Sequence, residues 1–395
     1  MRIFFINRFY WPDEPATAQL LTDLAEALAA RGRSVTVITS RPAGAPARET
    51  RRGVQIERVG PTRHPGKGLA AKAGNFAVFL AAACWRLARA VRKGDAVVAL
   101  TDPPLVGVGA AAVAGLRGAR LFHWTQDIYP EIAIALSGHG WLRLLRPLRD
   151  AAWRRAEGCV TLGRDMAAAF TAAGVPPGRI RVVPNWAPAG VGPADPAAVG
   201  ALRRSWGFEG KFVVAYSGNL GRVHDLAPVL AAAEILRGEP DIVFAFIGDG
   251  GARPALEAEV RHRGLGQVRF FPAQPRDQLA TVLAAGDVHL VTLRADCAAF
   301  VFPSKLYGIA AVGRPAVFVG PAGCEPARLV TGHGFGWAFS GEEMPALADR
   351  LRDLRAAPAV PAAAGAAALR FAAESGGPEQ AAAAWDRLLG GDRVK

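Results

Sequence analysis

The segment 302–315 carries the residues with the clearest chemical potential in the chain. Its sequence predicts a tight turn and then a small-residue helix that begins near Lys305 and ends at Gly-Arg-Pro. A buried strand is predicted to follow over 316–319. A helix start offers backbone N–H groups and the positive end of the helix dipole, and Lys305 adds an ammonium. These groups together suit a diphosphate. An ordinary helix–strand unit with a solvated lysine explains the same letters equally well.

A second cation follows another predicted strand, in the segment 216–222. Gly218 lets the backbone approach a ligand closely, and the guanidinium of Arg222 can fork onto phosphate oxygens. A plain strand–turn–helix connection is the alternative. We favour the binding interpretation because Arg222 and Lys305 come from two strand ends of one predicted sheet, where two cations would suit a leaving diphosphate.

Two further strand-end turns offer backbone groups to a ligand on this side. The glycine-rich turn 247–251 is a weak signal by itself. The backbone of the turn 272–275 could bind the flat edge of a nucleotide base, but a purely structural turn explains this segment equally well. The candidates that these turns and the 216–222 turn add are Asn219, Gly248, Pro272 and Ala273.

The first half of the chain has its own cluster of titratable residues, in the segment 122–131. His123, Asp127 and Tyr129 stand at the predicted end of a parallel strand, where polar groups are candidates for a cleft. A single histidine is most often structural, but a histidine and an aspartate four residues apart at a strand end favour a site. The segment 7–17, with Tyr10 and Thr17, is expected to line the opposite lip.

Short apolar strands alternate with amphipathic helices along both halves, which predicts an α/β fold with parallel sheets covered on both faces. We expect two Rossmann-like, doubly wound domains facing across a cleft, joined in the Pro- and Gly-rich stretch 184–196, with ligand at the carboxyl ends of the strands. The expected strands are 2–7, 34–39, 53–59, 96–100, 119–124, 159–162, 180–183, 212–216, 242–247, 268–271, 288–292 and 316–319.

Composition narrows the class of protein. A chain of 395 residues with 51% apolar and 21% charged residues is globular and long enough for two domains. The net charge of +13 is carried by scattered arginines with no interleaved aromatic platform, so nucleic acid is a less favoured partner than an anionic lipid or a phosphorylated substrate. Four widely separated cysteines form no zinc or disulfide pattern and fit a reducing cytosol.

Two helical segments leave a membrane role open. The segment 141–155 mixes tryptophan, leucine and arginine, as does 67–93, and such segments can lie at a membrane surface or simply pack on their own sheet. The longest apolar runs, 76–85 and 106–116, are shorter than the roughly 20 residues that span a bilayer. The strand that opens at Met1 leads us to expect no signal peptide. We therefore expect a cytoplasmic protein, peripheral at the inner face of the cell membrane if these helices bind anionic lipid.

Six motifs in order resemble the bacterial family 4 retaining glycosyltransferases of the GT-B fold. The likeness covers nearly the whole chain and is greatest to the branch that builds surface polysaccharides and lipid-linked oligosaccharides. The motifs lie at 1–33, 126–131, 182–186, 216–222, 246–250 and 303–308.

The resemblance implies an acceptor domain at 1–187, a nucleotide-sugar domain at 188–372 and a last helix, 373–395, that packs back on the first domain. Arg222 and Lys305 would hold the donor diphosphate, with Gly218 and the amides of Ser304 to Leu306 letting it approach, and His123 would contact the transferred sugar. Such enzymes retain the anomeric configuration without a metal, so no cofactor is expected. The donor would be a nucleotide-sugar substrate, UDP-sugar favoured over GDP-sugar, carrying a hexosyl or N-acetylhexosaminyl group to a lipid-linked or glycan acceptor.

One departure from the family concerns its Glu-x7-Glu pair, whose two positions fall here on Phe300 and Gly308. Glu325, after the next predicted strand, is a hypothesis for the ribose contact, and Asp296 could approach the sugar. The departure keeps a catalytically silent nucleotide-sugar-binding subunit open as an alternative. A nucleotide-sugar 2-epimerase shares such a fold but needs carboxylates placed for proton abstraction, and here Asp127 and Glu131 are the only candidates.

Overall fold

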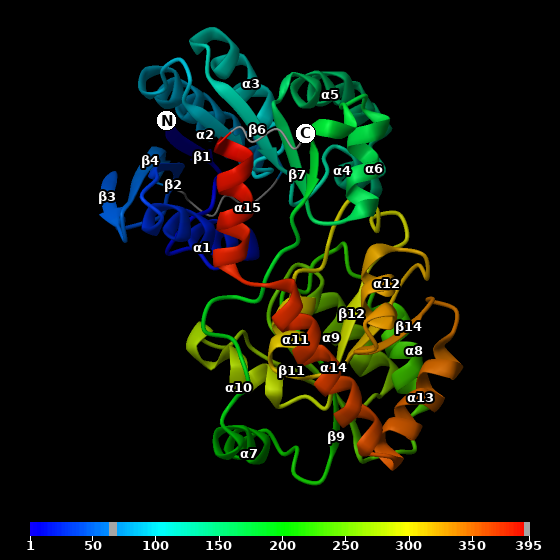
Figure 1. Ribbon diagram of the computed structural model, residues 1–395. Coiled ribbons are helices and arrows are strands. Elements are labelled where there is room, and N and C mark those ends of the chain that lie inside the picture. Colours follow the sequence, from blue (N-terminus) through cyan, green and yellow to red (C-terminus); the bar gives the residue numbers. More distant parts are fainter. Residues whose placement is uncertain (63–68, 391–395) are drawn as a thin grey trace. The chain divides into compact units, whose positions relative to one another are not determined.

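The computed structural model describes residues 1–62 and 69–390, and the chain divides into two compact units (Figure 1). Unit 1 comprises Met1–Asn185 and Gly377–Lys395, and unit 2 comprises Trp186–Gly376. The sequence placed the two boundaries after residues 187 and 372. The second boundary lies later because the alanine-rich helix α14 (Ala359–Ser375) packs on α11 (Lys305–Ala311) within unit 2.

Unit 1 is built on an eight-stranded sheet with the order β3-β4-β2-β1-β5-β6-β7-β8. All neighbours are parallel except β3 and β4, which form an antiparallel pair at one edge. The central strands read as continuous apolar runs because both faces are covered. β3, with the sequence Arg-Glu-Thr-Arg, was not predicted, since a charged edge strand has no apolar pattern. The strands are β1 (Arg2–Ile6), β2 (Ser34–Arg41), β3 (Arg48–Arg51), β4 (Val54–Thr62), β5 (Ala96–Ala99), β6 (Arg120–Trp124), β7 (Gly158–Thr161) and β8 (Ile180–Val182).

Helices cover both faces of this sheet. The sequence analysis treated 141–155 as one helical segment. The structure instead has a 3₁₀ turn followed by a new α-helix with Pro147 in its first turn, where a proline needs no N–H partner. The helical elements are α1 (Ala16–Ala30), α2 (Leu69–Ala90), α3 (Val106–Arg117), α4 (Glu131–Ser137), η1 (Gly140–Leu145), α5 (Arg146–Arg155), α6 (Arg164–Ala172), η2 (Pro177–Arg179) and α15 (Pro378–Gly390).

The C-terminal helix α15 is part of the core of unit 1, beside α1 (Figure 1). Trp385 is fully buried, with its ring centroid 5.5 Å from that of Trp124 and 6.4 Å from that of Phe5. Asp386 accepts a hydrogen bond from Arg33 at 2.5 Å. A fully buried tryptophan between two strands of the sheet ties the end of the chain to unit 1 far more strongly than the surface ion pair does.

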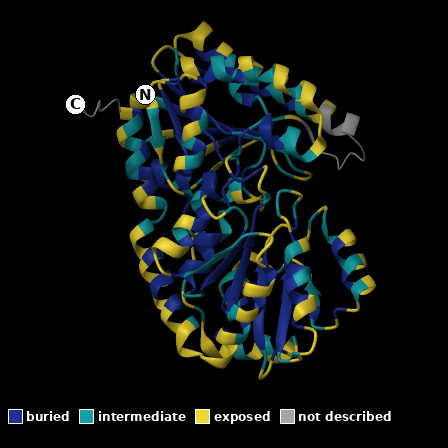
Figure 2. Ribbon diagram, turned by 90° about the vertical axis from the view of Figure 1, so that its right-hand side faces the viewer, coloured by how far each residue is buried: buried dark blue, intermediate teal, exposed yellow. Residues whose placement is uncertain are grey.

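Unit 2 has a six-stranded, fully parallel sheet with the order β11-β10-β9-β12-β13-β14. Its four central strands are buried, its edge strands β11 and β14 are largely half-buried, and the outer faces of its helices are exposed (Figure 2). The apolar core therefore lies between sheet and helices. The strands are β9 (Phe212–Ser217), β10 (Ile242–Ile247), β11 (Val268–Phe271), β12 (Val288–Thr292), β13 (Ala316–Val319) and β14 (Gly336–Phe339). The other helical elements are α7 (Pro196–Ser205), α8 (Ala227–Ile235), α9 (Arg253–Arg263), η3 (Arg276–Gln278), α10 (Leu279–Ala284), α12 (Glu325–Gly332) and α13 (Met344–Ala356).

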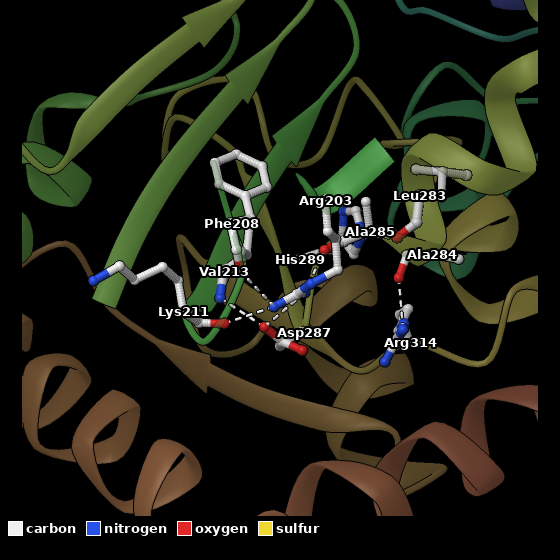
Figure 3. A network of polar contacts seen from close by, with 10 residues as sticks. All are labelled: Arg203, Phe208, Lys211, Val213, Leu283, Ala284, Ala285, Asp287, His289 and Arg314. Atoms are coloured by element: carbon white, nitrogen blue, oxygen red, sulfur yellow. Dashed lines mark hydrogen bonds and ion pairs between the residues drawn. The ribbon is translucent and has the colours of Figure 1, made fainter. Parts of the chain in front are cut away.

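A polar network fixes the amino-terminal edge of this sheet (Figure 3). Asp287 accepts hydrogen bonds from the backbone N–H of Val213 at 2.7 Å and from Arg203 at 3.1 Å. Arg314, from the Gly-Arg-Pro stop after α11, donates to the carbonyl of Ala284 at 2.5 Å. These contacts join α7, β9, β12 and α10 at the edge opposite to the strand ends that carry Lys305 and Gly218. The network therefore stabilises the fold of unit 2.

Candidate functional site

Lys305, the first residue of α11, holds an enclosed ammonium in unit 2. Its Nζ lies 3.5 Å from the centroid of the Tyr216 ring, is buried, and has no hydrogen-bond partner among the described residues. Burial disfavours the charged form and lowers the pKa of Lys305 to about 7. A buried cation that contacts only an aromatic face lacks a counter-charge, and an anionic ligand would supply one.

Glycines let two loops close around this ammonium. A Cβ on Gly218 would lie 3.6 Å from Lys305 Nζ. Gly248 has φ +135°, and a Cβ there would lie 2.2 Å from the carbonyl oxygen of Gly218, which no side chain permits. The hydroxyl of Tyr216 donates to the carbonyl of Asn219 at 2.9 Å. The structure thus brings four residues that the sequence singled out, at 218, 219, 248 and 305, to one place.

His224 belongs to the same cluster and was missed by the sequence analysis. Its Nδ1 lies 2.7 Å from the carbonyl oxygen of Thr292, and its ring packs edge-on against Tyr216. Burial and the neighbouring charge of Lys305 lower the pKa of His224 to about 3, so the imidazole is neutral at physiological pH. Its place two residues after Arg222, in the turn already singled out, was the available signal.

In the loop after β12 an arginine binds one of the carboxylate candidates. The backbone N–H of Arg294 donates to the carbonyl of Val223 at 3.0 Å, which joins this loop to the loop after β9. Arg294 binds both oxygens of Asp296, at 3.0 and 2.7 Å. Asp296, which we expected to approach the sugar, is therefore neutralised by its neighbour. Arg222 lies exposed on the loop after β9.

The remaining donor-side candidates have mixed placements. The N–H of Leu306 donates to the carbonyl of Pro303 at 3.2 Å, so it is already engaged, unlike our expectation of an amide facing the diphosphate. Ser304 precedes α11 without a side-chain capping bond.

Glu325 begins α12 and pairs with Arg328 at 2.7 Å on its own helix. The loop after β11 is exposed at both of its candidate positions, Pro272 and Ala273.

In unit 1, His123 lines a small, half-open cavity. It is the fourth residue of β6, is 3% exposed, and lines a cavity of about 30 Å³. A Cβ on Gly107 would lie 2.5 Å from its ring, so α3 approaches the imidazole as closely as a glycine permits. Burial lowers the pKa of His123 to about 4 despite a hydrogen bond with the backbone of Ala152. The imidazole is therefore neutral, and its Nε2 has no hydrogen-bond partner among the described residues.

Asp127 lines the same cavity from the loop after β6. Burial and the negative charge of Asp102 raise the pKa of Asp127 to about 7. Asp102 is itself paired with Arg8, whose Nε lies 2.9 Å from the carboxylate. A carboxyl group that titrates near neutrality at the carboxyl end of a parallel strand is suited to exchange a proton with a bound hydroxyl.

Buried partners fix the loop that carries Asp127. The side chains of Gln126 and Asn185 exchange two hydrogen bonds, at 3.2 and 3.0 Å. Arg149 donates to the carbonyl of Tyr129 at 2.9 Å and to the carboxylate of Glu131 at 2.6 Å. Glu131, the second carboxylate that an epimerase would need, is thus already bound by an arginine.

The two acceptor-side candidates of the segment 7–17 differ from each other in how far they are exposed. Tyr10 is fully buried, and burial raises the pKa of its hydroxyl well above the ordinary value. The chain turns back at Trp11-Pro12 and carries this aromatic ring into the core of unit 1, so Tyr10 does not line a surface that an acceptor can reach. Thr17, in the first turn of α1, is half-buried.

The described residues contain no group of three or more His, Cys, Asp or Glu side chains arranged to hold a metal ion. Metal independence itself stays a prediction, since it concerns the reaction.

The fold defines the class of protein. The chain aligns over 98% of its length with 98% of sucrose-phosphate synthase from Thermosynechococcus elongatus, with a TM-score of 0.80 at 17% identity. It aligns over 99% of its length with all of the Anabaena protein Alr3699/HepE in complex with UDP, with a TM-score of 0.74 at 17% identity. At such identities the likeness shows the fold alone, which is the GT-B fold predicted from the sequence.

Sequence comparison gives the family. Residues 17–186 match the glycosyl transferase 4-like domain, and residues 200–370 match the glycosyl transferases group 1 domain. The chain belongs to the family 4 glycosyltransferases of the GT-B fold.

Two curated relatives are glycosyltransferases by name. WcaI of Escherichia coli, named for colanic acid biosynthesis, is 32% identical over 60% of this chain. WbjE of Pseudomonas aeruginosa is 29% identical over 67% of this chain. The matches span 60% of WcaI and 66% of WbjE, so the chain covers less than two thirds of either relative's own length.

Proposed function

We propose that this chain transfers a sugar, with retention of anomeric configuration, from a nucleotide-diphosphate-sugar to a lipid-linked or saccharide acceptor during cell-surface polysaccharide assembly. The observation that carries the proposal is the buried ammonium of Lys305, which has the aromatic face of Tyr216 on one side and no hydrogen-bond partner among the described residues. A donor diphosphate would supply the missing charge, and Gly218 leaves room for it.

In the proposed reaction the bond between the anomeric carbon and the diphosphate oxygen breaks, and its electron pair stays on the diphosphate. The acceptor oxygen forms the new bond on the same face, and the acceptor proton passes to the departing phosphate oxygen. Lys305, with Arg222 on the exposed loop, stabilises the charge that develops on the diphosphate, which is the main catalytic effect available to such a site. Since these cations carry the charge, we expect a chelator to leave nucleotide affinity unchanged.

We assign the acceptor to unit 1, at the carboxyl end of β6. Asp127, in its ionised form, would accept a hydrogen bond from the acceptor hydroxyl, and its pKa near 7 allows that form to be populated at neutral pH. His123 is too buried, at 3% exposed, to contact a sugar directly without a local opening, so its proposed part is to hold the inner wall of this site.

UDP is the nucleotide we favour. The neighbour Alr3699/HepE is crystallised in complex with UDP and with UDP-glucose, and the name of WcaI places it in colanic acid biosynthesis. These facts concern those proteins, and they support the choice of UDP and of a polysaccharide acceptor here without fixing either.

Calorimetric titration with UDP, GDP, ADP and TDP tests the donor assignment. We expect one nucleotide to bind clearly best, and Lys305→Ala to weaken that binding by about a hundredfold, because it removes a charge-assisted contact to phosphate. Lys211→Ala is the matched control, since Lys211 lies at the opposite end of β9 and is paired with Asp241 at 3.1 Å. Equal affinity in the protein and the Lys305 variant would overturn the assignment.

The missing glutamate pair favours a second candidate, a catalytically silent nucleotide-sugar-binding subunit. The two family positions hold Phe300 and the buried Gly308, and Glu325 is engaged with Arg328. A donor-hydrolysis assay distinguishes the candidates. Slow release of nucleotide from the bound donor, abolished in the Lys305→Ala variant, supports the transferase, whereas tight binding without any release supports the silent subunit.

A further inference from the structure

A cavity of about 390 Å³ lies at the amino-terminal edge of the sheet of unit 2, and none of its lining residues is a donor or acceptor candidate. Residues at the starts of β9 and β12 line it, together with the turn after α11 and the corner between α13 and α14. Its volume falls within the range of small-molecule binding sites. The cavity is therefore large enough for a ligand of its own.

This cavity is separate from the site around Lys305. Phe212 lines the cavity at the start of β9, whereas Gly218 follows the end of the same strand. Arg314 lines the cavity just after α11, whereas Lys305 is the first residue of that helix. The two sites thus lie at opposite edges of one sheet, and a small ligand bound in one does not occupy the other.

Arg314 brings a half-buried positive charge to the cavity (Figure 3). Its guanidinium donates to the carbonyl of Ala284 at 2.5 Å and forms no ion pair with any described residue. Burial lowers the pKa of Arg314, although an arginine stays charged, and the charge of Asp287 opposes this effect. Asp287 is itself bound by Arg203 at 3.1 Å and by the backbone N–H of Val213 at 2.7 Å. The charge of Arg314 is therefore only partly offset, and an anion in the cavity would offset the rest.

Two further cations line the cavity and share one carboxylate. The Nζ of Lys211 lies 3.1 Å from one oxygen of Asp241, and a guanidinium nitrogen of Arg355 lies 2.5 Å from the other. Among the charged lining residues and their ion-pair partners, two carboxylates thus face four cations, which leaves two positive charges uncompensated. The cations are Arg203, Lys211, Arg314 and Arg355.

The corner between α13 and α14 adds apolar groups to the lining. Leu354, in the last turn of α13, is buried, and Pro361 and Ala362 belong to the first turn of α14. The corner is fixed because α13 packs on α8 and α14 packs on α11. No described helix, taken singly, is long and apolar enough to cross a bilayer, and one bent pair, 344–356 with 359–390, meets the length and composition criteria only when joined.

We propose that this cavity binds a small phosphorylated organic molecule that is not the nucleotide-sugar donor. A phosphate monoester carries about −1.5 to −2 charges at neutral pH, which matches the two uncompensated cations. Its oxygens would accept charge-assisted hydrogen bonds from Arg314, while the organic part would pack against Leu354 and Pro361. The inference depends on charge and shape at this edge of unit 2 and is independent of the chemistry proposed for Lys305.

Calorimetric titration of the full chain with phenyl phosphate tests the proposal. This probe combines a phosphate monoester with an apolar ring, so we expect it to bind. Inorganic phosphate should bind about tenfold more weakly, because it leaves the apolar part of the lining exposed to water. Benzyl alcohol, which has the ring and no charge, should not bind measurably.

Two variants assign the probe to the cavity. Arg314→Gln should weaken the binding of phenyl phosphate by about tenfold or more, because it removes a charge-assisted contact. Ala362→Phe should abolish binding by filling the cavity, and it leaves the contact between Arg314 and Ala284 in place. The test therefore stands even if Arg314→Gln does not fold.

Three control variants should bind phenyl phosphate as the wild type does. Arg261→Gln removes the charge of an exposed arginine on α9, away from the cavity. Ala363→Phe adds the same ring at the exposed neighbour of Ala362, which does not line the cavity. Lys305→Met removes the cation of the donor site. Circular dichroism confirms that each variant is folded.

Four results would overturn the proposal. Phenyl phosphate could fail to bind the wild type at millimolar concentration, or could bind Ala362→Phe as tightly as the wild type. Binding that is lost in Lys305→Met but kept in Arg314→Gln would assign the probe to the donor site. Benzyl alcohol that binds as tightly as phenyl phosphate would show an apolar site with no preference for an anion.

Discussion

In unit 2 the loop after β9 and the start of α11 enclose an ammonium, whereas in unit 1 the loop after β6 encloses a carboxyl group. Both groups are at the carboxyl ends of parallel strands, and burial disfavours the charged form of each. The pKa of Lys305 falls to about 7 and that of Asp127 rises to about 7. The same type of scaffold thus holds a cation suited to a phosphate in one unit and an acid suited to a hydroxyl in the other.

The comparison also separates polar side chains that have a hydrogen-bond or ion-pair partner within their own unit from a side chain that has none among the described residues. Glu131, Asp296 and Glu325 are bound by arginines of their own unit, and His224 contacts a backbone carbonyl. Lys305 has only the face of Tyr216. Lys305, which our account assigns to the ligand, thus has no hydrogen-bond partner for its ammonium among the described residues. This distinguishes Lys305 from the candidates that already have one.

The largest effect we expect concerns the apolar core that supports unit 1. Trp385→Ala should destabilise unit 1 by about 3–5 kcal/mol, because it empties a fully buried site between Trp124 and Phe5. Hydrogen-exchange mass spectrometry would show the loss of protection in unit 1, with unit 2 as internal control. Equal loosening of both units would mean that α15 is not specific to unit 1.

A smaller effect of opposite sign is expected in unit 2. Lys305→Met removes the burial cost of the charge and should stabilise unit 2 below pH 7 by about 1–2 kcal/mol. The folded pKa lies below the ordinary value of 10.5, so the unfolded state binds more protons between about pH 7 and 10.5. The wild type therefore gains stability as pH rises through that window, and the gap to the variant closes.

Protection of unit 2 amides measured at pH 6 and pH 9 would detect this change. Lys211→Met is the control, since Lys211 is paired with Asp241 and should lose rather than gain stability. A Lys305→Met variant less stable than the wild type at pH 6 would contradict the claim that the ammonium is uncompensated.

Asp127→Asn should give the converse pH dependence in unit 1, at about 1 kcal/mol or less. The folded pKa of Asp127 is raised, so the unfolded state releases its proton first and the wild type loses stability between about pH 4 and pH 7. The variant lacks this loss and should be the more stable chain above pH 7. Asp102→Asn should lower the pKa of Asp127, which carboxyl NMR would register; an unchanged value would exclude coupling of the two carboxylates.

The smallest effect is expected for Glu325→Ala, which tests the ribose hypothesis. Because Glu325 already pairs with Arg328, we expect the variant to weaken UDP binding by less than about tenfold. Affinity that does not change at all would end the hypothesis that Glu325 replaces the family glutamate.

Much of the fold could be predicted from the sequence because strands buried on both faces appear as apolar runs, as in β1, β9 and β13. Helix α3 was missed because its Gly- and Ala-rich sequence has the composition of a buried run without helical periodicity. The edge strand β3 was missed because its charged residues give no apolar pattern that would indicate a strand.

The site was predictable where one segment carries the chemistry, as at Lys305 and Gly218. His224 and Arg294 were not found because their roles depend on two loops that meet in space, through Val223 and Thr292. Tyr10 was assigned to the acceptor side because its segment follows the first strand, but its ring is fully buried. Sequence position cannot show which way such a turn faces.

The most direct test of the central claim is the number of protons taken up when UDP binds. Calorimetry of UDP binding in two buffers of different ionisation enthalpy, above pH 7, measures this number. Our account predicts uptake approaching one proton, lost in Lys305→Met, because a diphosphate stabilises the charged form of an ammonium that is otherwise neutralised near pH 7. UDP binding without proton uptake, or with the same uptake in the variant, would contradict the assignment of Lys305 to the diphosphate.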